Sequence, residues 1–115
     1  MSQTFGLNAV AIEVKWGDAV AVSQVENALK EHPETRGVIM VASETSTGVR
    51  HPYEEIGQLI KERPNCLYVV DAVTALGVWD IAPEREHIDV LVAGGQKGLM
   101  LPPGLGFVWV SDKAW

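Results

Sequence analysis

Residues 66–70 read CLYVV, a short apolar run that ends at Asp71. A run of this length without polar alternation is typical of a strand buried on both faces of a parallel sheet. Two further runs have a similar character, residues 37–42 (GVIMVA) and residues 88–93 (IDVLVA). These three runs predict the central strands of one parallel sheet.

The segments between the apolar runs have helical spacing. Asp18 is a candidate N-cap for a helix that runs to Lys30, and a second helix is expected from Pro52 until Pro64. The inward stripes would be Val22, Val25, Ala28 and Leu29 in the first helix, and Ile56, Leu59 and Ile60 in the second. Residues 8–14 (NAVAIEV) and 105–110 (LGFVWV) are expected to be further strands. Alternating strands and helices predict an α/β fold, a three-layer α/β/α sandwich with a mostly parallel sheet.

Composition limits the classes of protein to which the chain could belong. With 115 residues and 47% hydrophobic content, the chain can form one domain-sized core. The formal net charge of −6 argues against a nucleic-acid or anionic-membrane surface, because phosphate binding needs a concentrated basic face. No apolar run approaches the roughly 20 residues of a membrane span. We therefore expect a soluble, cytoplasmic protein.

The cysteine and the histidines carry little functional signal. A single cysteine, Cys66, rules out an internal disulfide, and its place at the start of a buried strand predicts a small core residue. A cysteine desulfurase would need a reactive cysteine on a mobile loop instead. His32, His51 and His87 lack the spacing of metal ligands, so no metal site is expected.

Polar residues follow each of the three apolar runs, at residues 43–48 (SETSTG), 71–74 (DAVT) and 94–97 (GGQK). The carboxyl ends of parallel strands meet at one edge of a sheet, so these residues should face one crevice. Pyridoxal phosphate needs a lysine to form a Schiff base and an acid to keep its pyridine nitrogen protonated. Lys97 and Asp71 could supply both groups, which predicts a pyridoxal phosphate site.

Three segments resemble the class V aminotransferases, most closely the serine–glyoxylate and alanine–glyoxylate type. They are residues 44–49 (ETSTGV), 69–77 (VVDAVTALG) and 94–106 (GGQKGLMLPPGLG), and their order and spacing also agree with the family. The likeness covers nearly the whole chain, although a complete family member is much longer. Residues 1–115 are therefore expected to be part of the large, cofactor-binding domain of a fold-type I pyridoxal phosphate enzyme.

The resemblance implies a role for each of five residues. Lys97 would carry the cofactor as a Schiff base, and Asp71 would bond to the pyridine nitrogen, which makes both catalytic candidates. Val73 would lie against the ring face and Thr45 would contact the cofactor. Gln96 would reach toward the phosphate.

The implied activity is transamination between a small amino acid, serine or alanine, and a 2-oxo acid such as glyoxylate. The family also implies a homodimer or larger self-association. Two alternatives remain open: a truncated, catalytically silent fragment that acts at most as a weak cofactor-binding or interaction module, and a lyase of the same fold. The family's phosphate-binding helix, ring-stacking aromatic residue and substrate-binding arginine have no counterpart in these residues. We therefore expect slow or undetectable turnover from the isolated chain.

Overall fold

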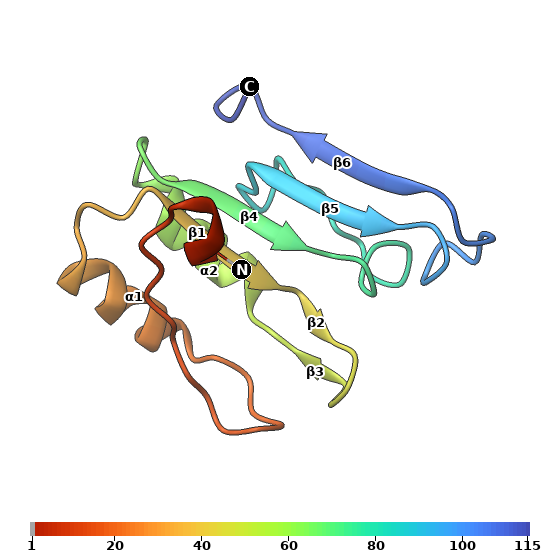
Figure 1. The fold of residues 1–115 in the computed structure, drawn as a ribbon, viewed down its shortest axis with the longest axis horizontal. Helices are drawn as coiled ribbons and strands as arrows, with labels where there is room; N and C mark the ends of the chain where they lie inside the picture. The colour runs from red at the N-terminus through yellow and green to blue at the C-terminus, as the bar shows by residue number, and fades with distance from the viewer. Residues whose placement is uncertain (1) are drawn as a thin grey trace.

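The computed structural model describes residues 2–115, which build a four-stranded sheet with the strand order β1-β4-β5-β6 (Figure 1). The strands are β1 (Gly37–Val41), β4 (Leu67–Asp71), β5 (Val90–Gly94) and β6 (Gly106–Val110). β1, β4 and β5 are parallel, and β6 runs antiparallel to β5. The predicted mostly parallel α/β sheet is confirmed, with strand boundaries within two residues of those expected.

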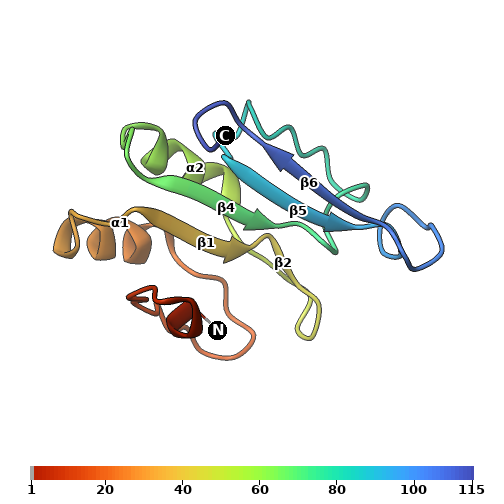
Figure 2. The same ribbon diagram turned by 45° about the horizontal axis from the view of Figure 1, so that its top comes forward.

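Both α-helices, α1 (Val22–Glu31) and α2 (Tyr53–Lys61), lie on one face of the sheet. The short 3-10 helix η1 (Ser2–Phe5) and the extended chain after it lie on the other side (Figure 2). This second side is thinly covered, and Ile39 at the middle of β1 is 66% exposed. The burial of residues 37–42 on both faces, which the sequence predicts, is therefore not realised within residues 2–115. None of the helices in this part of the chain is long and apolar enough to cross a membrane.

Residues 8–14 form no strand, contrary to the sequence prediction. Their apolar side chains are largely solvent-exposed, with Val10 at 56% and Ile12 at 37%. Alternating apolar residues favour a strand only when a neighbouring strand pairs with them. No strand of residues 2–115 pairs with this segment, so it remains extended and without ladder hydrogen bonds.

The first helix begins later than predicted, and Asp18 does not cap it. Ala21 is the N-cap residue, and its N–H donates to Gln24 Oε1 at 2.9 Å. The N–H of Asp18 donates instead to the Lys15 carbonyl at 2.9 Å, in a turn before the helix. The side chain that accepts a hydrogen bond from a free backbone N–H at the helix start is thus a glutamine at the third helical position, and not the expected aspartate.

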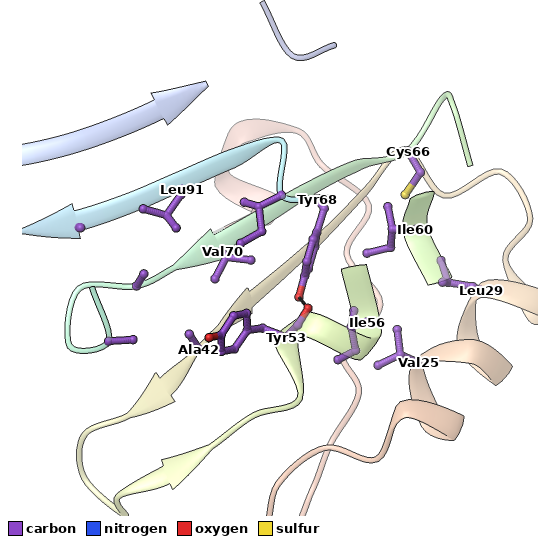
Figure 3. Close-up of a cluster of buried hydrophobic side chains, with 14 residues drawn as sticks. Val25, Leu29, Ala42, Tyr53, Ile56, Ile60, Cys66, Tyr68, Val70 and Leu91 are labelled. Carbon is purple, nitrogen blue, oxygen red and sulfur yellow. Dashed lines mark hydrogen bonds between the residues drawn. The ribbon is translucent and has the colours of Figure 1, made fainter. Parts of the chain in front are cut away.

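The hydrophobic core lies between β4 and the two helices (Figure 3). Ile56 and Ile60 on α2 are fully buried, as their helical spacing predicts, and pack with Tyr68 of β4. The Tyr68 hydroxyl donates to the Tyr53 carbonyl at 2.9 Å, which satisfies a polar group in the centre of this core. Cys66 is 1% exposed, so its predicted role as a core residue is confirmed.

Candidate active site

The three predicted polar segments meet at the carboxyl ends of β1, β4 and β5. There they surround an open cavity of about 300 Å³. Its lining is formed by Val41, Ser43, Glu44, Thr45, Asp71, Val73, Thr74 and Lys97. The structure therefore brings together four of the five residues that the sequence singles out: Thr45, Asp71, Val73 and Lys97. Gln96 is exposed and does not line this cavity, and its role stays a prediction.

Thr45 lies at the tip of a short hairpin formed by β2 (Ser43–Glu44) and β3 (Val49–Arg50). The Glu44 carboxylate accepts hydrogen bonds from the N–H of Ser46 at 2.9 Å and from its hydroxyl at 2.6 Å. The Thr47 hydroxyl donates to the Glu44 carbonyl at 3.5 Å. Of the three consecutive hydroxyls in this loop, only that of Thr45 has no hydrogen-bond partner within residues 2–115, which leaves it available to a ligand.

Glu44, in the predicted polar segment 43–48, also lines the cavity, although the sequence gives it no individual role. The two hydrogen bonds from Ser46 stabilise the ionised carboxylate and hold the pKa of Glu44 below its ordinary value. A carboxylate at this rim adds negative charge to the cavity. Its position after an apolar strand, in the same segment as Thr45, places it at this edge of the sheet.

Asp71 is the last residue of the central strand β4, between Val41 of β1 and Val92 of β5. Its Oδ1 accepts the N–H of Val73 at 2.9 Å, an Asx-type turn that fixes the carboxylate at the strand end. Oδ2 makes no hydrogen bond within residues 2–115. A carboxylate held in this way presents one free oxygen to a cationic N–H in the cavity.

Thr74 belongs to the predicted polar segment 71–74 and lines the cavity, although the sequence gives it no individual role. Its Oγ1 donates to the carbonyl of Ser43 at 3.1 Å. This hydrogen bond joins the loop after β4 to the hairpin after β1. The sequence predicts that the segments of Ser43 and Thr74 meet, but no local pattern indicates this particular hydrogen bond, because the two residues are 31 positions apart.

Lys97 lies in the loop of residues 95–105 between β5 and β6, at a turn where the Met100 N–H donates to the Lys97 carbonyl at 2.9 Å. Its side chain is exposed and forms no ion pair or hydrogen bond with any residue in 2–115. The glycine that follows is required by packing, because a Cβ at Gly98 would lie 2.5 Å from the Leu76 carbonyl oxygen. The glycine-rich sequence thus lets this turn pack against the loop after β4, and Lys97 lines the same cavity as Asp71.

A second, larger cavity of about 500 Å³ lies at the opposite end of the sheet, before β5. Its wall includes Asp89, which is 5% exposed and accepts hydrogen bonds from Tyr68 N–H, the Ser111 hydroxyl and Lys113 Nζ. These bonds connect β4, β5 and the C-terminal turn. Asp89 is therefore a structural group, and the three predicted polar segments all lie at the other end of the sheet.

Comparison with known proteins identifies the family. The sequence profile described as Aminotransferase class-V matches residues 1–115. The soluble hydrogenase 42 kDa subunit of Anabaena cylindrica is 43% identical over 117 residues, covering 100% of this chain and 30% of that protein. Serine–glyoxylate aminotransferase of Methylorubrum extorquens is 36% identical over 117 residues, covering 99% of this chain and 29% of that protein.

Solved structures share the fold of this chain. The crystal structure of alanine–glyoxylate aminotransferase from Nostoc sp. matches with a TM-score of 0.91 and 32% identity, covering 98% of this chain and 29% of that one. The chain thus spans about 30% of the length of the relatives it matches. Its fold is that of a partial domain of the fold-type I pyridoxal phosphate enzymes. On the profile match and these relatives together, the chain belongs to the class V aminotransferase family.

Proposed function

We propose that this chain carries the cofactor centre of a pyridoxal-phosphate-dependent aminotransferase that transfers an amino group from a small amino acid, serine or alanine, to a 2-oxo acid such as glyoxylate. The observation that carries the proposal is the convergence of Thr45, Asp71, Val73 and Lys97 on one cavity from three separate loops. The names of the relatives from Methylorubrum extorquens and Nostoc sp. support the class of substrates.

The side chains around the cavity fit the chemical groups of pyridoxal phosphate. The Lys97 amine has no partner within residues 2–115, so it is free to react with an aldehyde. Asp71 Oδ2 can accept the N–H of a protonated pyridine ring, and the negative charge of the carboxylate favours that protonated form. Val73 offers an apolar surface to the ring, and the Thr45 hydroxyl offers a hydrogen bond.

When bound, the cofactor would supply an electron sink that stabilises negative charge at the α-carbon of the amino acid substrate. Once the amine of the amino acid substrate has replaced Lys97 on the cofactor aldehyde, the released Lys97 amine would accept the proton from that α-carbon as general base and donate it to the cofactor C4′ as general acid. Asp71 would orient the pyridine ring relative to Lys97 and keep the ring nitrogen protonated.

Binding of the phosphate group needs further donors. On this chain the Gln96 amide and the backbone N–H groups of the glycine-rich turn would contribute. A second copy of the chain in a homodimer, or the additional length present in the relatives, would complete the anion site. Because few donors for a dianion are present in residues 2–115, we expect the isolated chain to bind the cofactor weakly and to turn over slowly.

The experiment is to incubate the purified chain with pyridoxal phosphate, reduce with borohydride and locate the attached pyridoxyl group by mass spectrometry. Attachment to the peptide containing Lys97, and its loss in Lys97→Ala, is the expected result. Lys30→Ala is the matched control, because Lys30 is an exposed lysine on α1 that pairs with Glu26 and does not line the cavity. Equal labelling of Lys97 and the surface lysines would refute the assignment. Formation of 2-oxo acid from serine or alanine, with glyoxylate as acceptor, then tests the substrates.

A further inference from the structure

The hairpin β2–β3, which carries Thr45, has little stability of its own. Its ladder consists of two residue pairs, Ser43 with Arg50 and Glu44 with Val49. An isolated two-stranded hairpin is marginal in water at best, and this one is shorter than most. Contacts with the rest of the fold must therefore determine where Thr45 lies relative to Asp71.

The loop after β4 holds this hairpin on its first strand. The Thr74 hydroxyl donates to the Ser43 carbonyl at 3.1 Å. Thr74 lies three residues after Asp71, in a segment already fixed by the bond from Val73 N–H to Asp71 Oδ1. This side-chain bond lies next to the backbone bond from Ala42 N–H to the Asp71 carbonyl at 2.8 Å, and it extends the connection between the two backbones from Ala42 into the hairpin that carries Thr45.

The same loop holds the hairpin on its second strand. The Arg50 guanidinium lies 4.8 Å from the centre of the Trp79 ring and 5.5 Å from that of Tyr53, and it forms an ion pair with Glu54. The Tyr53 and Trp79 rings are stacked, with centres 6.1 Å apart and an interplanar angle of 6°. Arg50 therefore attaches β3 both to the start of α2 and to the loop after β4.

Both contacts act on one pair of residues, because Ser43 and Arg50 are opposite each other in the hairpin ladder. We propose that Thr74 and Arg50 are positioning residues. As a clamp, they hold the residue pair at the base of the hairpin against the loop after β4, and so set the separation between Thr45 and Asp71. The inference rests on the proposed function, since the clamp serves the cofactor centre. Arg50 does not line the cavity. Thr74 does line it, but its hydroxyl proton is donated to the Ser43 carbonyl, so the positioning role assigned to both residues acts through the hairpin.

The first test is amide hydrogen–deuterium exchange of the chain without any cofactor. Thr74→Val removes the hydroxyl and keeps the shape, Thr74→Ser restores the hydroxyl, and Arg50→Met removes the guanidinium. In Thr74→Val and Arg50→Met we expect residues 43–51 to exchange about five- to tenfold faster, the effect of losing roughly one hydrogen bond. Thr74→Ser should stay within about twofold of the unaltered chain by the same reasoning.

Thr35→Val is the matched control, because the Thr35 hydroxyl also donates to a backbone carbonyl, that of His32 at 2.7 Å, but after α1 and away from the cavity. It should leave exchange of residues 43–51 unchanged. The double variant Thr74→Val with Arg50→Met should be non-additive, since both contacts restrain one unit. Unchanged exchange of residues 43–51 in both single variants would overturn the proposal, whether or not the cofactor binds.

The second test is the dissociation constant for pyridoxal phosphate, measured by absorbance titration. Thr74→Val should weaken binding about five- to tenfold, with rescue by Thr74→Ser and no change in Thr35→Val. Equal weakening in Thr74→Val and Thr35→Val would mean a general loss of stability and would overturn the positioning role. If the unaltered chain forms no adduct at Lys97, the proposed function fails, and the exchange experiment alone decides whether the clamp exists.

Discussion

Asp89 is the buried charged group whose removal should affect the fold most strongly. Its Oδ2 accepts the backbone N–H of Tyr68 at 2.8 Å and Lys113 Nζ at 2.8 Å, and its Oδ1 accepts the Ser111 hydroxyl at 3.0 Å. Asp89→Ala leaves the N–H of Tyr68 buried and unpaired, at a cost of about 1 to 3 kcal/mol. Lys113 loses the Asp89 carboxylate as a partner but keeps its hydrogen bond to the Cys66 carbonyl at 2.6 Å. Because Lys113 is also partly exposed, the loss of its ion pair costs less free energy than the loss at Tyr68.

Together these losses predict that Asp89→Ala lowers the free energy of unfolding by about 3 to 4 kcal/mol. Asp89→Asn should lower it by only about 1 to 2 kcal/mol, because its oxygen can still accept from Tyr68 and Lys113 while its amide donates to Ser111. With an m-value of about 1.5 kcal/mol/M, the urea midpoint would fall by roughly 2 M in the alanine variant and roughly 1 M in the asparagine variant.

Urea unfolding followed by circular dichroism gives these midpoints. The matched control is Asp80→Ala, because Asp80 pairs with Arg85 at 3.0 Å while its side chain is 88% exposed. That exposed pair should contribute less than about 1 kcal/mol. If Asp89→Ala costs no more than Asp80→Ala, the argument that Asp89 connects β4, β5 and the C-terminal turn is refuted.

Three further predictions concern single groups. Replacing glycine by alanine stabilises an ordinary exposed helix by about 1 kcal/mol. Gly57→Ala should instead lower the free energy of unfolding in urea by about 2 kcal/mol, because the new Cβ would lie 1.9 Å from the Glu86 carbonyl oxygen. A stabilised variant would contradict this packing. The pKa of Glu44 is lowered by Ser46, so this interaction is present above the unfolded-state pKa and is lost as the pH falls through the folded one. Ser46→Ala should therefore raise the Glu44 pKa in an NMR titration, and an unchanged pKa would exclude the bond. Burial raises the pKa of the Cys66 thiol, so a disulfide reagent should modify it slowly near neutral pH and rapidly in urea, whereas fast labelling of the folded chain would contradict its burial.

The central strands could be predicted from the sequence because burial leaves a local signature. The run at residues 66–70 and those at residues 37–42 and 88–93 all became strands, with ends within two residues of prediction. The helical spacing of Ile56 and Ile60 likewise predicted the buried face of α2, and both side chains are buried. In each case the apolar periodicity of a short segment is sufficient, because the segment's own pattern records the face on which it packs.

The N-terminal part could not be predicted in this way. Residues 8–14 have the alternation of a strand, yet pairing depends on a partner that the segment's own sequence does not specify. Asp18 is a good N-cap residue by type, but Gln24 satisfies the helix start at Ala21 instead. Local propensity allows the helix to begin after Asp18 or after Ala21. The start after Ala21 is accompanied by a tertiary contact, the hydrogen bond from Val20 N–H to His51 Nδ1 at 3.2 Å.

The same division holds for the candidate site. The sequence alone determined that Thr45, Asp71, Val73 and Lys97 follow strand ends, and parallel pairing was enough to bring them to one edge of the sheet. Only the tertiary structure determined that Thr74 bonds to Ser43 and that Arg50 lies over Trp79. The physical reason is that strand ends are positioned by a regular ladder, whereas a two-pair hairpin is positioned by individual contacts between residues distant in the sequence, which leave no periodic pattern.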